Sequence, residues 1–260
     1  MIPKVIHYCW FGKKPLPELA IKCIQSWKKF LPDYEIKEWN ESNFNVNIIP
    51  YTQEAYQAGR YAFVSDYARF WILYKYGGIY FDTDVQMIKP MEEIINKGPF
   101  MGCENDSILS VAPGLGLGVN PQNPLYKEIL DSYTQLHFLL EDGSYNQTTV
   151  VTYITEILVK HGLQISTHIQ QCAGIYIYPK EYFCPKDFLT SKITITPNTV
   201  TIHHYDGTWL TEDIIYMRKL AKRLGNNRLG FYIAGVVMQI KFHGIIATLK
   251  YCLGFITKRI

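Results

Sequence analysis

The sequence lacks the features that mark several large classes of protein. None of its 260 residues belong to an apolar run of about 18 residues, the length that a membrane-spanning helix needs. No basic segment followed by an apolar stretch opens the chain, so we expect no secretion signal. The six cysteines include no CxxC pair and no metal-type spacing. We therefore expect reduced thiols rather than disulfides or a zinc site.

The chain also has little net charge, which argues against a nucleic acid partner. Lys and Arg number 26 and Asp and Glu 23, for a net charge of +3. Proteins that bind nucleic acid usually concentrate basic residues on one face, so we expect no nucleic acid partner. Hydrophobic residues make up 48% and charged residues 19%, which is typical of a globular protein with a substantial core.

The first part of the chain has the pattern of an α/β protein. An apolar run at 4–12 ends in glycine and predicts a strand, a helical pattern follows at 16–34, and 34–40 predicts a second strand. This β-α-β opening favours an α/β sheet. A largely uncharged helix is predicted within 56–78, and the glycine pair at its end is typical of a helix C-terminus.

Two aspartates follow that helix in the stretch YGGIYFDTDVQ at 76–86. If the stretch is a strand, Asp82, Asp84 and Tyr80 lie on the same side. Two such carboxylates repel by about 2.5 kcal/mol at an effective dielectric near 20, a cost that exposure, protonation or a bound cation removes. Although D-x-D alone is a common pattern, the apolar neighbours argue against exposure. If the carboxylates bind a cation, an oxygen-ligand site of this kind suits Mn²⁺ or Mg²⁺, which usually leave positions open for substrate phosphates.

Three stretches, at 2–12 (IPKVIHYCWFG), 65–85 (SDYARFWILYKYGGIYFDTDV) and 202–209 (IHHYDGTW), together resemble the glycosyltransferases with a DxD sugar-binding motif. That group, family 32, includes many bacterial capsule and surface-polysaccharide transferases and is similar to the catalytic domains of clostridial glucosylating toxins. The likeness is dense over 1–95, returns at 200–210 and is faint between. It implies an α/β fold of the GT-A type, with a Rossmann-like mixed sheet flanked by helices. It also implies a nucleotide-sugar donor, with UDP favoured, and transfer with retention of configuration.

The resemblance implies a metal site built from both aspartates and one histidine. Asp84 would be a direct ligand, and Asp82 would contact both the metal and the donor. Of the histidine pair, His204 matches the family best by its spacing to Gly207, and His203 would point away if this segment is a strand. The other interpretation is that both histidines are structural.

The resemblance further implies contacts to the donor. Asp66 and Arg69 would hold the hydroxyls of the sugar, although residues three apart on a helix also form ordinary ion pairs. Trp10 would stack on the nucleobase, unless it is a core side chain. The full set of predicted donor contacts is Cys9, Trp10, Asp66, Arg69, Tyr80, Asp82, Thr208 and Trp209, and the predicted catalytic set is Asp66, Arg69, Asp82 and Asp84. The sequence departs from the family in its middle, where 114–123 and 146–149 are candidates for the acceptor side.

The chain changes character after residue 210, so we expect a catalytic domain at 1–210 and a helical extension at 211–260. From residue 218 onward there are nine Lys and Arg and no Asp or Glu, beside apolar stretches. Such a basic amphipathic tail suits the surface of an anionic membrane. The alternative is a helical hairpin packed on the catalytic domain.

The sequence thus predicts a retaining, metal-dependent glycosyltransferase that uses a saccharide acceptor. We expect a lipid-linked acceptor in capsular or other surface polysaccharide synthesis, at the cytoplasmic face of the cell membrane. One alternative is a protein-modifying glycosyltransferase. Another, of a different class, is a non-catalytic nucleotide-sugar-binding subunit.

Overall fold

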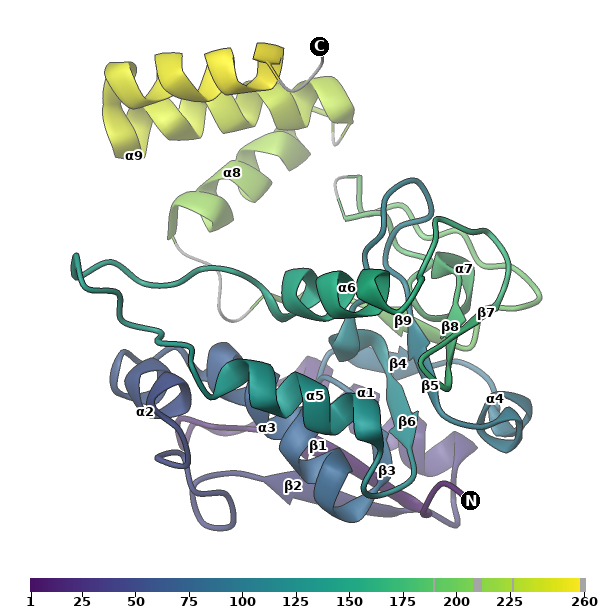
Figure 1. The fold of residues 1–260 in the computed structure, drawn as a ribbon. Coiled ribbons are helices and arrows are strands. Elements are labelled where there is room, and N and C mark those ends of the chain that lie inside the picture. The colour runs from purple at the N-terminus through teal and green to yellow at the C-terminus, as the bar shows by residue number, and fades with distance from the viewer. Residues whose placement is uncertain (189, 208–211, 226, 258–260) are drawn as a thin grey trace. The chain divides into compact units, whose positions relative to one another are not determined.

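The computed structural model describes residues 1–188, 190–207, 212–225 and 227–257 (Figure 1). These residues form two compact units. The first comprises Met1–Pro185 with Thr194–Tyr205, and the second Lys186–Ile193 with Asp206–Ile260. The domain boundary predicted between 210 and 211 falls within 208–211, outside the described residues.

A seven-stranded mixed sheet in the order β2-β1-β3-β6-β5-β8-β7 is the centre of the first unit. Strand β1 is parallel to both β2 and β3, whereas β6 is antiparallel to its two neighbours. A separate antiparallel pair joins β4 to β9. The strands are β1 (Val5–Cys9), β2 (Glu35–Trp39), β3 (Gly78–Tyr80), β4 (Val85–Met87), β5 (Phe100–Gly102), β6 (Leu117–Val119), β7 (Gln170–Cys172), β8 (Ile175–Tyr178) and β9 (Thr201–His203).

Helices flank this sheet, and the predicted α/β fold with a mixed sheet between helices is confirmed. In the first unit they are α1 (Glu18–Phe30), α2 (Pro50–Gln57), α3 (Tyr61–Tyr76), α4 (Glu92–Lys97), α5 (Pro124–Tyr133), α6 (Val150–Lys160), α7 (Lys180–Phe183) and the 3₁₀ turn η1 (Pro113–Leu115). Both strands and both helices predicted within the first 78 residues are present as β1, α1, β2 and α3.

Strand alternation sorts the core into two layers, one on each side of the sheet. Tyr80 of β3 packs in the layer that contains α3 and α5, whereas its neighbours Ile79 and Phe81 pack with Trp27 of α1. Successive side chains of a strand point to opposite faces, which explains this division. Tyr80 is therefore directed at α3, the helix that carries Asp66 and Arg69.

Two glycines let α3 end directly beside β1. Gly77 and Gly78 have φ of +64° and +102°, a region that favours glycine. A β-carbon at Gly78 would lie 2.7 Å from the carbonyl oxygen of Val5 in β1. The pair predicted as a helix end thus also permits the close approach of β3 to β1.

A turn separates the two aspartates of the D-x-D motif. Strand β3 ends at Tyr80, and the Val85 N–H donates to the Asp82 carbonyl oxygen at 3.1 Å before β4 begins. The expectation of one continuous strand with both carboxylates on the same face is therefore wrong. On the far side of the turn the indole N–H of Trp27 donates to the Val85 carbonyl at 2.7 Å, which fixes the start of β4 against α1.

The helices of the second unit are α8 (Glu212–Arg223) and α9 (Arg228–Thr257), and α9 has a break at Gly244. Ala234 and Met238 of α9 are buried with Met217 and Ala221 of α8. Among the described residues, no helix combines the length and the apolar character needed to cross a bilayer.

His7 fixes the register of β1, β2 and the end of α3. The side chain is 1% exposed, and its Nδ1 accepts the indole N–H of Trp39 at 3.0 Å. Because Trp donates only, Nε2 carries the proton and donates to the Gly77 carbonyl, also at 3.0 Å. Burial lowers the pKa of His7 to about 4, against the raising effect of the Gly77 hydrogen bond.

This burial predicts a specific loss of stability in acid. In the unfolded state His7 binds a proton near pH 6.5, the ordinary pKa of histidine. In the folded state it binds this proton only near pH 4. The contribution of His7 to the free energy of unfolding should therefore fall by about 3 kcal/mol as the pH is lowered through this window. Urea unfolding from pH 7 to pH 4 should show a shallower pH dependence for His7→Gln than for the wild type. Ile79→Val, which removes one buried methyl group and no titrating group, should keep the wild-type slope; equal slopes for all three proteins would contradict the assignment.

Candidate active site

Three parallel strands bring the predicted residues to one edge of the sheet. Strands β2, β1 and β3 lie side by side and run in the same direction, so their carboxyl ends meet at the same edge. The residues that follow these ends are Asn40, Trp10 and, two positions beyond β3, Asp82. In open α/β sheets ligands bind at this edge, next to the point where the strand order reverses.

The guanidinium of Arg69 joins two carboxylates at this edge. Its Nη2 lies 2.9 Å from Asp66 Oδ1 and 3.3 Å from Asp82 Oδ1, and the Arg69 side chain is only 5% exposed. Arg69 Nε donates to the Ser65 carbonyl at 3.1 Å, and the guanidinium lies 5.0 Å from the ring centre of Tyr80. The Tyr80 hydroxyl donates to Asp82 Oδ1 at 3.0 Å. The structure thus brings together Asp66, Arg69, Tyr80 and Asp82, which the sequence predicted as neighbours.

Burial and charge set the protonation of this group. Burial raises the pKa of Asp66 to about 7, against the lowering effect of Arg69. Burial also opposes the charge on Arg69, but the nearby acidic groups, Asp82 first among them, together outweigh it and raise the pKa of the guanidinium, which stays cationic. The side chain of Asp66 keeps 13% of its surface exposed. An oxygen held in this way can accept a hydrogen bond from a ligand hydroxyl.

Asp84 is paired with a histidine from β9. His203 Nε2 lies 3.2 Å from Asp84 Oδ1, whereas His204 Nε2 lies 2.9 Å from Oε1 of Gln86. His204 contacts Asp84 through the backbone: the His204 N–H donates to the Asp84 carbonyl at 2.9 Å. The structure therefore places the ring of His203 on the motif carboxylate, and a metal-ligand role for His204 stays a prediction. Burial lowers the pKa of His203, but the charge and hydrogen bond of Asp84, together with Cys184, outweigh it and raise the pKa to about 10.

The donor set fits Mn²⁺ or Mg²⁺ as a partial shell. Within the described ranges, no three His, Cys, Asp or Glu side chains gather as a metal cluster. Asp82 and Asp84 supply oxygen ligands, and their side chains are 30% and 17% exposed. Both ions accept a few carboxylates together with water and phosphate oxygens, so two aspartates suffice if a bound diphosphate completes the shell.

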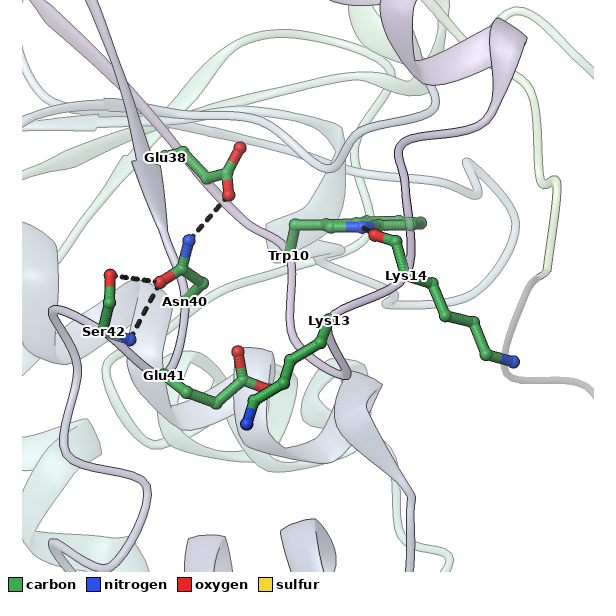
Figure 2. Close-up of a pocket in the computed structure, with 7 residues that line it drawn as sticks. All are labelled: Trp10, Lys13, Lys14, Glu38, Asn40, Glu41 and Ser42. Carbon is green, nitrogen blue, oxygen red and sulfur yellow. Dashed lines mark hydrogen bonds between the residues drawn. The ribbon is translucent and has the colours of Figure 1, made fainter.

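A pocket of about 330 Å³ lies beside Trp10, at the ends of β1 and β2 (Figure 2). The Trp10 indole N–H donates to the Lys14 carbonyl at 2.6 Å, which orients the ring. Hydrogen bonds from Tyr8 and the Gly12 backbone hold the two glutamates of the pocket. The lining residues are Trp10, Lys13, Lys14, Glu38, Asn40, Glu41 and Ser42. An aromatic ring beside two lysines suits a base attached to phosphates.

The remaining predicted donor contacts lie elsewhere. Cys9 does not line the pocket of Trp10; it is 7% exposed and packs in the α3 layer of the core. Burial raises the pKa of its thiol to about 12, and the charges of Arg69 and Asp82 also act on it. Thr208 and Trp209 lie outside the described residues.

Comparison with known proteins bears on this same part of the chain. Residues 17–101 match the family described as "Glycosyltransferase sugar-binding region containing DXD motif". This segment therefore resembles part of a glycosyltransferase. The segment includes α3 and the D-x-D turn, and the expectation of a D-x-D glycosyltransferase is confirmed for this region. It covers 85 of the 260 residues, and the family 32 grouping is still a prediction.

Two curated relatives come from Schizosaccharomyces pombe. Inositol phosphoceramide mannosyltransferase 3 is 32% identical over 99 residues, which are 36% of this chain and 28% of the relative. Inositol phosphoceramide mannosyltransferase 1 is 31% identical over 111 residues, which are 38% of this chain and 33% of the relative. The chain thus spans about a third of the length of these relatives. A solved structure described as PaToxG Glycosyltransferase superposes with a TM-score of 0.47 at 22% identity, over 61% of this chain and 69% of that one.

Gly114 is a residue of the site whose role the sequence did not reveal. The sequence made its loop a candidate for the acceptor side, and the structure places Gly114 against the D-x-D turn, where its carbonyl accepts the Asp82 N–H at 3.1 Å. A β-carbon at Gly114 would overlap Asp82 Oδ2 and lie 3.4 Å from Arg69 Nη1. The glycine-rich composition of the loop was visible in the sequence, but its return to Asp82 was not.

Gly114→Ala should therefore displace the Asp82 carboxylate from Arg69. We expect affinity for the predicted UDP-sugar donor to fall at least about tenfold, the loss of roughly one charge-assisted contact. Gly102→Ala is a matched control, because its β-carbon would meet Phe183 in the core at 2.8 Å, away from the carboxylates. Calorimetric titration should show donor affinity preserved in Gly102→Ala. Equal losses in both variants would indicate general destabilisation and contradict the specific role of Gly114.

Proposed function

We propose that this protein is a retaining, metal-dependent glycosyltransferase that moves a sugar from a nucleotide sugar, with UDP favoured, to a saccharide acceptor. The observation that carries the proposal is the Asp66–Arg69–Asp82 group at the carboxyl edge of the sheet. It lies within the segment that matches a glycosyltransferase sugar-binding region. The adjacent pocket with Trp10 and two lysines supports a nucleoside diphosphate as part of the donor.

Each residue of the site has a role in this proposal. Trp10 stacks on the base, and Asp66 accepts hydrogen bonds from sugar hydroxyls while Arg69 holds its carboxylate in place. Asp82 and Asp84 hold Mn²⁺ or Mg²⁺, which when bound stabilises the negative charge of the departing diphosphate.

Retention follows from attack on the same face as the leaving group. The bond from the anomeric carbon to the diphosphate oxygen breaks, a bond to the acceptor oxygen forms, and the acceptor proton passes to the diphosphate. Asp66 and Asp82 both direct oxygens to Arg69, which favours a role in holding the donor over one as a covalent nucleophile. A glycosyl-enzyme adduct in a mass spectrum would contradict this route.

We further propose that the acceptor is lipid-linked and that the reaction serves capsular or other surface polysaccharide synthesis. The named substrates of the fission yeast relatives are inositol phosphoceramides, which are membrane lipids, and this supports an acceptor at a membrane. On α9, Leu229, Ile233 and Ile240 are 68%, 42% and 48% exposed, at spacings that place them on one helix face. With the basic excess after residue 218, this face suits an anionic bilayer on the cytoplasmic side of the cell membrane.

The central test of the proposed function is donor hydrolysis over a panel of UDP- and GDP-sugars with Mn²⁺. We expect turnover of at least one UDP-sugar, abolished by EDTA and reduced about 10²- to 10³-fold in Asp84→Asn, because charge stabilisation of the leaving group is lost. Asp142→Asn is the matched control, since Asp142 is an exposed loop residue, and it should retain wild-type turnover. If the wild type and Asp84→Asn bind donor but are equally inactive across the panel, the protein is a nucleotide-sugar-binding subunit instead.

The membrane proposal predicts sedimentation with lipid vesicles. We expect binding to vesicles that contain phosphatidylglycerol and weak binding to pure phosphatidylcholine, because each well-placed basic residue contributes about 1 kcal/mol at an anionic surface. The double variant Ile233→Asp/Ile240→Asp should lose at least about tenfold in vesicle affinity. Ile165→Asp changes a residue that is 60% exposed in the first unit and should bind as the wild type does. Equal sedimentation of all three proteins would contradict an α9 contact with lipid.

A further inference from the structure

The contact between Asp84 and His203 joins the middle of the first unit's sequence to its C-terminal end. Asp84 belongs to the turn before β4 and His203 ends β9, and the two strands pair with Val85 opposite His203. The backbone on both sides of the contact is fixed, because the His204 N–H donates to the Asp84 carbonyl. The side chains of His203 and Asp84 are 15% and 17% exposed. Their positions are therefore set by the β4–β9 pair.

The ring of His203 has a second neighbour in Tyr205. The ring of Tyr205, two residues along the chain, lies 4.2 Å from it between centroids. The Tyr205 hydroxyl lies 2.9 Å from the sulfur of Cys184, which is fully buried. Tyr205 has a φ of +54°, an uncommon value for a bulky residue that persists only where surrounding contacts maintain it. Tyr205, whose hydroxyl contacts Cys184, thus packs against the imidazole.

The atom that faces Asp84 limits what His203 can do. Nε2 is the nitrogen that lies 3.2 Å from Asp84 Oδ1. A ring nitrogen that donates its N–H to a carboxylate has no lone pair for a cation, so the same nitrogen cannot serve as a metal ligand. Such a histidine can still fix the orientation of a carboxylate that binds a metal, and partners of this kind change metal affinity about 10- to 100-fold.

We propose that His203 is a positioning residue that holds the Asp84 carboxylate for a divalent cation, with Cys184 and Tyr205 holding the imidazole in turn. The proposal rests on the proposed function for the cation and on the structure for the Asp84–His203 contact. It gives β9 a role in preparing the second aspartate of the motif before any donor binds. His203 touches neither donor nor metal in this account.

The first test uses metal-free protein and does not depend on catalysis. A double-mutant cycle with His203→Ala and Asp84→Asn, read by thermal unfolding in EDTA, should give non-additive changes in Tm, because either variant removes the same contact. Additive changes would overturn the proposal. They would leave the proposed function standing, since Asp84 could bind a metal without His203.

The second test distinguishes positioning from ligation. The amide nitrogen of glutamine can replace Nε2 as a donor to Asp84, so His203→Gln should keep the Kd for Mn²⁺ within about threefold of the wild type, whereas His203→Ala should raise it about tenfold or more. Calorimetric titration of Mn²⁺ without donor measures both. Equal losses in His203→Gln and His203→Ala would overturn the proposal in favour of a ring nitrogen as ligand, and unchanged affinity in His203→Ala would also overturn it. Absence of Mn²⁺ binding in the wild type would count against the proposed function, while a non-additive cycle would still support His203 as the residue that holds Asp84.

Discussion

The buried charge of Arg69 is the interaction on which the rest of the site depends. A guanidinium does not lose its proton in a protein, so its burial on α3 requires nearby carboxylates. Asp66 from the same helix and Asp82 from the turn after β3 provide them. Removing either one would leave the buried guanidinium with a single carboxylate partner. The pairing therefore fixes α3 to the D-x-D turn and holds both carboxylates at the carboxyl edge of the sheet.

The scaffold beneath this charge group makes the pairing possible. Strand alternation directs Tyr80 toward α3, where its hydroxyl reaches Asp82. Neutral His7 and the glycine pair hold the end of α3 against β1, and Trp27 of α1 holds the far end of the turn. Each of the two aspartates then has its own partner of opposite charge, Arg69 for Asp82 and His203 for Asp84. The repulsion within the motif is relieved by partners from different elements, and a divalent cation would add to this arrangement.

Much of the local structure followed from the sequence because its causes are local. Periodicity and glycine placement predicted β1, α1, β2 and α3, and the spacing of Asp66 and Arg69 predicted their shared face. The turn at Asp82–Val85 was missed because an apolar run with alternating aspartates has the pattern of a strand. The position of Gly114 against Asp82 and the choice of His203 beside Asp84 depend on the packing of η1 and on the register of β9. Long-range pairings of this kind leave no periodic signal in a single sequence.

The central claim is that Asp66, Arg69, Asp82 and Asp84 form one site for a metal and a nucleotide sugar. Anomalous diffraction at the manganese edge, from crystals grown with Mn²⁺ and a UDP-sugar that the protein binds, tests it most directly. The account predicts one anomalous peak within ligand distance, about 2.0–2.5 Å, of carboxylate oxygens of the D-x-D turn, with the sugar beside Asp66 and the base against Trp10. A peak bound elsewhere, or a donor ordered away from Arg69, would contradict the account.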